Sequence, residues 1–136
     1  MSVADENLKV IRRGYDLFFA GQTEEFFTMF DDEVEMVEAD SLPYGGTLKG
    51  KSTVTKAIMS VRSNWDKMTL DIHTLTAGDD YVIAYGTFAA TGLKTGIKAT
   101  FPLAEVWRLK NGKVVFLNPV YGDVALANKA MGHVPA

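Results

Sequence analysis

The feature that most constrains the fold of this chain is a change in its hydrophobic period near Asp66. Before Asp66, apolar residues recur every three to four positions, which is the spacing of one helix face. In the first such segment these residues are Leu8, Ile11, Tyr15 and Phe18. After Asp66, apolar and polar residues alternate, as is typical of strands. Helices that come early and strands that come late predict an α+β fold.

Cap and turn residues set the boundaries that we expect for these elements. Ser2 and Gly21 bound the first helix, and the hairpin signal Asn111-Gly112 separates the last two strands. The predicted order is α-α-β-α-β-β-β-β with a short helix after it, and the hairpin links make the sheet mostly antiparallel. We predict helices over 3–20, after Thr23, over 51–65 and over 123–131, a loop over 40–50, and strands over 34–39, 68–77, 81–91, 97–109 and 113–121.

Length and composition bound the class of protein. With 136 residues, we expect a single domain over 1–136. The formal net charge of −3 disfavours nucleic acid as a partner, because phosphate binding needs clustered positive charge. The lack of cysteine excludes disulfides and thiolate metal sites, and two histidines cannot form a three-His site. We expect neither metal nor cofactor.

The chain carries no signal-peptide pattern at its N-terminus and no apolar run near the ~20 residues that span a bilayer. We therefore expect a cytoplasmic protein without membrane contact. The predicted strand 81–91 is apolar on both faces, with Tyr81, Ile83 and Tyr85 on one face and Val82 and Phe88 on the other. Helices can cover only one face, so we expect a homodimer through the sheet.

A glycine-rich segment, Gly45 to Ser52, reads GGTLKGKS and matches the phosphate-binding pattern G-x-x-x-x-G-K-[ST]. A phosphate-binding loop directly follows a buried apolar strand of a parallel sheet. Here Pro43 and Tyr44 interrupt the approach, and the strands that follow form hairpins. We therefore interpret the segment as a loop that leads into a helix.

Five segments resemble the nuclear transport factor 2-like superfamily, and more closely its SnoaL-like branch. They are YDLFFAG (15–21), FDD (30–32), PYGGTLKGKSTV (43–54), FPLAEVWRLKNGKV (101–114) and PVYGD (119–123). The resemblance implies a strongly bent sheet wrapped around the helices into a cone, or α+β barrel, with one apolar pocket. Proteins of this kind include ketosteroid isomerases, polyketide cyclases, dehydratases, epoxide hydrolases and non-catalytic binding domains.

The steroid isomerases among them imply candidate catalytic residues. Glu38 occupies the place of their acidic general base, with Asp40 as a rival two residues on. Glu105 matches their second, protonated acid. Their first-helix tyrosine corresponds to Gly14, and Tyr15 is one residue away, so the resemblance carries over only in part.

Strand periodicity supports an inward position for Glu105, since Phe101, Leu103, Trp107 and Leu109 share its face. Such a carboxyl has a raised pKa and stays neutral, which suits a proton donor. The alternative is a structural glutamate paired with an Arg or Tyr. For Glu38 and Asp40 the alternative is a solvated strand edge. The side chains that we predict to line the pocket are Tyr15, Phe18, Phe30, Trp65, Phe101, Trp107 and Tyr121.

Two classes of function follow from this interpretation. The first is a cofactor-independent isomerase, cyclase or dehydratase that acts next to the carbonyl of a small apolar or cyclic molecule. In it, Glu38 or Asp40 removes a proton while Glu105 and a tyrosine stabilise the enolate. The second is a non-catalytic ligand-binding or scaffold domain, and an epoxide hydrolase-like enzyme is a further alternative. Two carboxyl groups that converge in one cavity would favour an enzyme.

Overall fold

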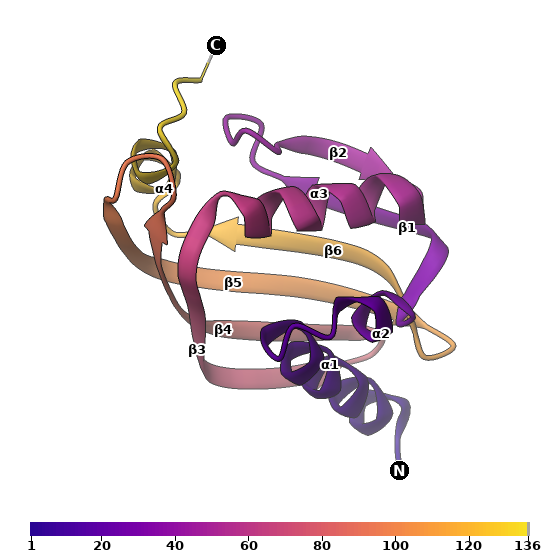
Figure 1. Ribbon diagram of the computed structural model, residues 1–136. Helices are drawn as coiled ribbons and strands as arrows, with labels where there is room; N and C mark the ends of the chain where they lie inside the picture. The colour runs from indigo at the N-terminus through magenta and orange to yellow at the C-terminus, as the bar shows by residue number, and fades with distance from the viewer. Residues whose placement is uncertain (136) are drawn as a thin grey trace.

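The computed structural model describes residues 1–135 and confirms the α+β fold. Six strands form one curved sheet in the order β2-β1-β6-β5-β4-β3 (Figure 1). All neighbouring strands are antiparallel except β1 and β6, which are parallel. The elements in chain order are α1 (Val3–Phe19), α2 (Thr23–Phe27), β1 (Phe30–Glu38), β2 (Gly46–Lys49), α3 (Lys51–Ser63), β3 (Trp65–Gly78), β4 (Tyr81–Gly92), β5 (Lys98–Lys110), β6 (Lys113–Tyr121) and α4 (Val124–Met131).

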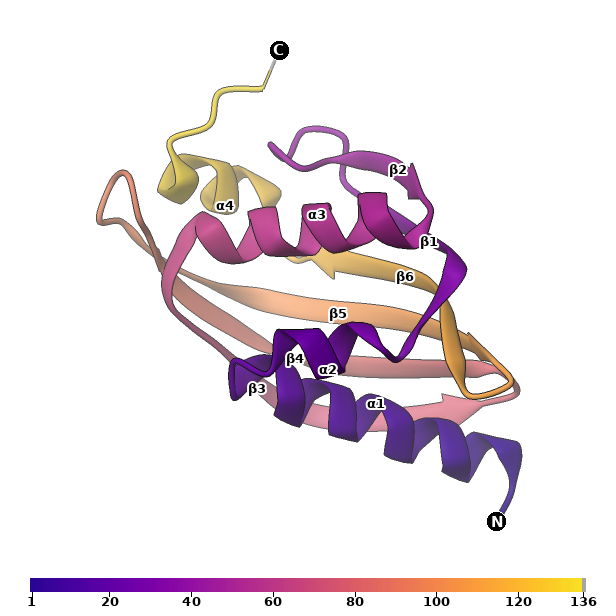
Figure 2. The same ribbon diagram turned by 45° about the vertical axis from the view of Figure 1, so that its right-hand side comes forward.

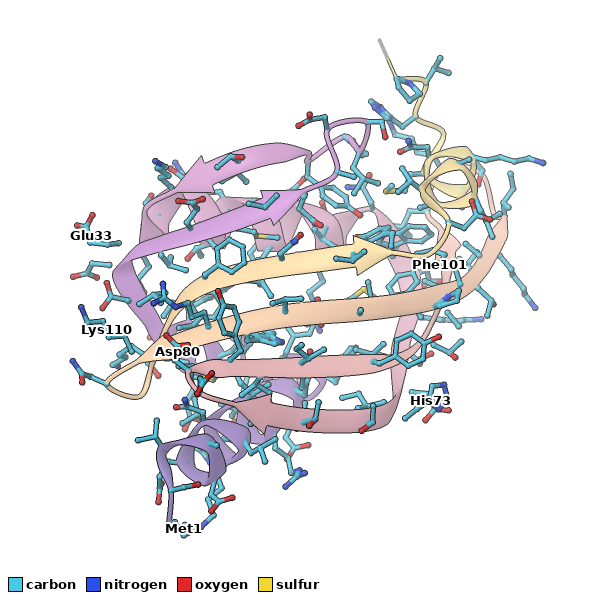
Figure 3. All side chains as sticks on the ribbon, turned by 180° about the vertical axis from the view of Figure 1, so that it is seen from behind. Met1, Glu33, His73, Asp80, Phe101 and Lys110 are labelled. Carbon is cyan, nitrogen blue, oxygen red and sulfur yellow. The ribbon has the colours of Figure 1, made fainter. Side chains whose placement is uncertain are left out.

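The sheet has two free edges, β2 and β3, so the cone is open rather than a closed barrel. Helices α1, α2 and α3 lie over its concave face (Figures 1 and 2). From behind, no helix crosses the convex face of β4, β5 and β6 (Figure 3). The interior of the domain is therefore the space between the concave face and the N-terminal helices.

Local signals explain most boundaries. Ser2 and Asp5 form a capping box at the start of α1, and Gly21 adopts a φ of 79° just after its end. Asn111 and Gly112 both have positive φ, as a two-residue hairpin turn requires. Asp123 caps α4 by accepting a hydrogen bond from the Leu126 amide. The four predicted C-terminal strands are all present.

The structure corrects three sequence-based boundaries. Strand β2 lies inside the predicted loop 40–50, where it pairs with β1 at the edge of the sheet. Strand β1 begins at Phe30 rather than near residue 34, and its first half contains the exposed acidic residues Asp32 and Glu33. Trp65 is the first residue of β3 and not the end of a helix. In each case strand pairing, which local periodicity does not reveal, decides the boundary.

The glycine-rich segment contains β2 and the first two residues of α3. Gly50 has a φ of 91° between them, and its amide donates to the Val34 carbonyl. The segment thus joins an antiparallel edge strand to a helix, unlike a phosphate-binding loop.

Candidate active site

A cavity of about 90 Å³ lies between the concave face of the sheet and the helices. Its wall is mainly aromatic and aliphatic, and its ionisable side chains are two glutamates and two tyrosines. Among the described residues, no Lys, Arg or His lines it. These four ionisable residues are Tyr15, Glu38, Glu105 and Tyr121. The cavity therefore combines apolar walls with two carboxyl groups and no compensating positive charge.

Strand register brings the two carboxyl groups to the same wall. Glu105 on β5 pairs with Pro119 on β6. Strand β1 runs parallel to β6 with Met36 beside Leu117, so Glu38 is level with Pro119 two residues on. Adjacent strands are ~4.8 Å apart, which separates the two glutamate Cα atoms by about 10 Å. Because both side chains line the cavity, the bent sheet brings the two carboxyl groups toward each other.

Glu105 is held by a hydrogen-bonded chain that begins in the core. The Trp107 indole Nε1 donates to the Tyr15 hydroxyl at 2.9 Å. Tyr15, on α1, donates in turn to Glu105 Oε1 at 2.8 Å. Burial raises the pKa of Glu105 to about 7, and the bond from Tyr15 opposes that rise. Glu105 thus lies close to its titration point at neutral pH.

Glu38 has different surroundings. It is 3% exposed, and its Oε1 has no hydrogen-bond partner within residues 1–135. Burial raises its pKa to about 9, and the charge of Glu105 adds to the rise. Glu38 is therefore a neutral carboxylic acid at pH 7, with an oxygen that lacks a partner.

A pair of tyrosines lies near Glu38. The hydroxyls of Tyr44, in the loop between β1 and β2, and Tyr121, at the end of β6, are 2.5 Å apart. Burial raises the pKa of both, and the Glu38 charge raises them further. Asn128 of α4 donates to the Ser41 carbonyl at 3.0 Å, so α4 fastens the loop that carries Tyr44.

The structure places the sequence-predicted residues in three groups. Six of them line the cavity: Tyr15, Phe18, Glu38, Glu105, Trp107 and Tyr121. Phe30, Trp65 and Phe101 are buried in the two hydrophobic clusters and are not part of the cavity wall. Asp40 is exposed, because β1 ends at Glu38 and the chain turns, so the alternation that would place both acids on one face stops. Asp40 is not part of the cavity wall.

Sequence reasoning missed several wall residues, including Phe19, Phe26, Phe88 and Pro119. Alternation along a strand could have found two of them. Phe88 is on the buried face of β4, and Pro119 lies between Leu117 and Tyr121 on the buried face of β6. The contributions of α1 and α2 depend on how these helices pack, which the sequence does not show.

The described part of the chain shows neither a metal-binding cluster nor a membrane-spanning helix. Within residues 1–135, no group of three His, Cys, Asp or Glu side chains is arranged so that it could hold a metal ion. None of the helices there has the length and apolar character needed to cross a membrane.

Comparisons with solved structures show the same fold. An NTF2-like protein of unknown function from Burkholderia pseudomallei is 25% identical, with a TM-score of 0.84 over 96% of this chain and 98% of that one. TerC, co-crystallised with polyporic acid, is 22% identical, with a TM-score of 0.82 over 93% and 98%. A proposed SnoaL-like polyketide cyclase from Jannaschia is 12% identical, with a TM-score of 0.83 over 99% and 97%.

The sequence comparisons give the family. No curated protein matches the chain significantly. The pattern of the SnoaL-like domain matches residues 11–117, which include the second half of α1, all of β5 and the first half of β6. The chain therefore belongs to the SnoaL-like domain family.

Proposed function

We propose that this protein is a cofactor-independent enzyme that moves a proton next to the carbonyl group of a small apolar or cyclic molecule. The observation that carries the proposal is the pair of carboxyl groups, buried Glu38 and half-buried Glu105, on one wall of an apolar cavity. Two acids whose surroundings separate their pKa values can act as acid and base in one step. Isomerisation, cyclisation and dehydration all begin with such a proton transfer.

A neutral carboxylic acid in the cavity wall can stabilise an enolate intermediate. Water-free surroundings strengthen a hydrogen bond to a developing oxyanion, and a neutral carboxylic acid can donate that bond. The lack of a lining Lys, Arg or His in the described residues disfavours anionic ligands such as phosphates. A neutral ketone is the ligand class that this wall accepts at least cost.

The size of the cavity adds a requirement. Sites for drug-sized ligands occupy ~300 Å³ or more, so a ring-sized ligand must displace wall residues of the 90 Å³ cavity. Phe19 lines the cavity and is 40% exposed. A surface groove between α1 and β3 shares Tyr15, Phe19 and Leu70 with the cavity. We take this groove as the entry path, with Phe19 as the side chain that moves.

The named neighbours support a ring-containing ligand. TerC was co-crystallised with polyporic acid, and the Jannaschia protein is a proposed polyketide cyclase. These ligands and activities belong to those proteins, and at 22% and 12% identity the likeness shows the fold. For this chain they suggest where a screen of cyclic ketones should begin.

Hydrogen exchange tests the proposal without knowledge of the natural substrate. Cyclohexanone is incubated with the protein in D₂O, and loss of the proton signal next to its carbonyl is followed by NMR. We expect faster exchange with the native chain than with buffer, and no acceleration by the double variant Glu38→Gln/Glu105→Gln. Glu33→Gln is the matched control, because Glu33 is exposed on the same strand as Glu38 (Figure 3).

The alternatives are separate outcomes of this experiment. If cyclic ketones bind, seen as shifts of cavity signals, but no ketone exchanges, the protein is a non-catalytic ligand-binding domain. If ketones neither bind nor exchange while cyclohexene oxide is hydrolysed, the epoxide hydrolase-like alternative holds.

We also propose that the convex face of the sheet pairs with a second copy of the chain. Its exposed apolar side chains include Ile83, Tyr85 and Val120, whose exposed fractions are 41%, 47% and 49%. Register places Tyr85 beside Ala104 and Ala104 beside Val120, so they form one band across β4, β5 and β6. Light scattering at micromolar concentration should give a dimer mass, and Tyr85→Lys should give a monomer. A native monomer mass would contradict the proposal.

A further inference from the structure

We propose that Glu105 takes the proton and that Glu38 donates the hydrogen bond to the substrate oxygen. This assignment rests on the proposed function and reverses the roles that the resemblance to steroid isomerases implies. It follows from which polar atoms of each acid already have partners in the structure.

The chain Trp107–Tyr15–Glu105 has a fixed direction. An indole N–H can only donate, so the Tyr15 hydroxyl oxygen must accept from Trp107. The single hydrogen of Tyr15 is then directed at Glu105 Oε1. Glu105 is thus supplied with a donor, and an ionised carboxylate is the form that gains most from it. Tyr15 and Trp107 are positioning residues in this arrangement, since the Tyr15 hydrogen is already used and cannot bind a substrate oxygen.

Glu38 has no such donor. Its Oε1 is buried without a partner within the described residues. The titratable groups around it are Glu105 on β5, Tyr121 on β6 and Tyr44 in the loop after β1. The charge of Glu105 disfavours a negative charge on Glu38, and the two tyrosines stay neutral because burial raises their pKa values. None of the described lining residues is basic. Glu38 therefore keeps its proton, and its O–H lacks the acceptor that a bound carbonyl oxygen would supply.

The pKa values agree with this geometry. Burial raises both, but only Glu105, at about 7, is opposed by a donor. The pKa of Glu38, at about 9, contains a contribution from the charge of Glu105. Between pH 7 and pH 9 the pair therefore carries one negative charge, and that charge lies on Glu105.

The chemical step balances with these two groups alone. The C–H bond next to the carbonyl breaks, and its proton goes to the free oxygen of ionised Glu105. The electron pair of that bond forms the C=C bond of the enolate, and the carbonyl π pair moves to oxygen. This oxyanion accepts the hydrogen bond of neutral Glu38. Return of a proton from Glu105 to the same carbon completes the exchange that cyclohexanone reports. Where a second C=C of the substrate is conjugated with the enolate, return of the proton to the far carbon of that C=C gives the isomer, and either route restores the starting state.

Carboxyl NMR of the full-length chain tests the assignment without any substrate. Glutamate is labelled with ¹³C at its side-chain carboxyl, and the Glu38 and Glu105 signals are assigned by their absence in Glu38→Gln and Glu105→Gln. We expect the Glu105 signal to titrate first, near pH 7. In Glu105→Gln the pKa of Glu38 should fall, because the neighbouring charge is gone. In Glu38→Gln the pKa of Glu105 should change little, and Glu33→Gln should change neither.

Tyr15→Phe supplies the test of the positioning role. Loss of a hydrogen bond to a charged group should raise the pKa of Glu105 by about one to two pH units. The rising limb of the pH profile of kcat/KM for cyclohexanone exchange should move by the same amount, which a merely structural role would not cause. Folding of each variant is checked by circular dichroism.

Two results would overturn the inference: Glu38 titrating before Glu105, or no change in the Glu105 pKa on Tyr15→Phe. Failure of the proposed function is a different result, since it would leave the order of titration intact while no ketone exchanges.

Discussion

Glu105 and Glu38 lie two strands apart on the same cavity wall, yet their hydrogen-bond partners differ. Around Glu105, the indole of Trp107 and the hydroxyl of Tyr15 form a chain of hydrogen bonds that ends on the carboxyl. Around Glu38, the tyrosine hydroxyls bond to each other, and Oε1 is left without a partner in the described part of the chain. Glu105 thus has a hydrogen-bond donor in the fold, and Glu38 Oε1 has none in the described residues. This difference lets two identical side chains take opposite roles.

The largest expected effect is a difference between the exchange rates of the two single variants. Glu105→Gln removes the base, so the acceleration of cyclohexanone exchange should fall about 10³-fold. Glu38→Gln replaces a neutral donor by an amide that can still donate, and the loss should be only about 10-fold. Initial rates at pH 8 measure both. Equal losses would mean that the two acids are not specialised.

The next effect is the contribution of Glu38 to the pH dependence of the unfolding free energy. Its pKa is about 9 in the folded chain and near 4.5 when unfolded. Because the folded value is the higher one, folding favours the protonated form. That stability is complete below pH 4.5 and is lost as the pH rises toward 9. From pH 5 to pH 8 the native chain should lose about 4 kcal/mol more unfolding free energy than Glu38→Gln does.

Urea denaturation at the two pH values measures this difference, with Glu33→Gln as the control that keeps the native pH dependence. A native chain that is equally stable at pH 5 and pH 8 would mean that Glu38 is ionised at little cost, and the contrast between the two acids would disappear.

The positions of the two acids were partly predictable from the sequence, but their hydrogen-bond partners were not. Alternation along β5 placed Glu105 inside, since its apolar neighbours on that face are buried. The resemblance to steroid isomerases supplied Glu38, and alternation could not exclude its rival Asp40, because the end of β1 depends on the turn that follows. Alternation could not show that Tyr15 reaches Glu105, since that contact joins α1 to β5 across 90 residues.

The general fold was predictable for a related reason. Hairpin turns such as Asn111-Gly112 and the caps of α1 are local signals. Strand β2, the start of β1 and the position of Trp65 depend on pairing and packing between distant segments, and there the sequence-based boundaries were wrong. The roles of the two acids belong to this second class, because they depend on partners supplied by other elements.

The smallest expected effect concerns the tyrosine pair near Glu38. Tyr44→Phe removes one member of the tyrosine pair, which should cost about 1 kcal/mol of unfolding free energy for one neutral hydrogen bond. It should leave the pKa of Glu38 unchanged, because neither tyrosine donates to that carboxyl in the structure. Tyr15→Phe, the matched change at the other end, should raise the pKa of Glu105. Urea denaturation and the carboxyl titration measure both quantities on the same two variants. A rise in the Glu38 pKa on Tyr44→Phe would show that a tyrosine does supply Glu38 with a donor, and the two ends would then differ only in degree.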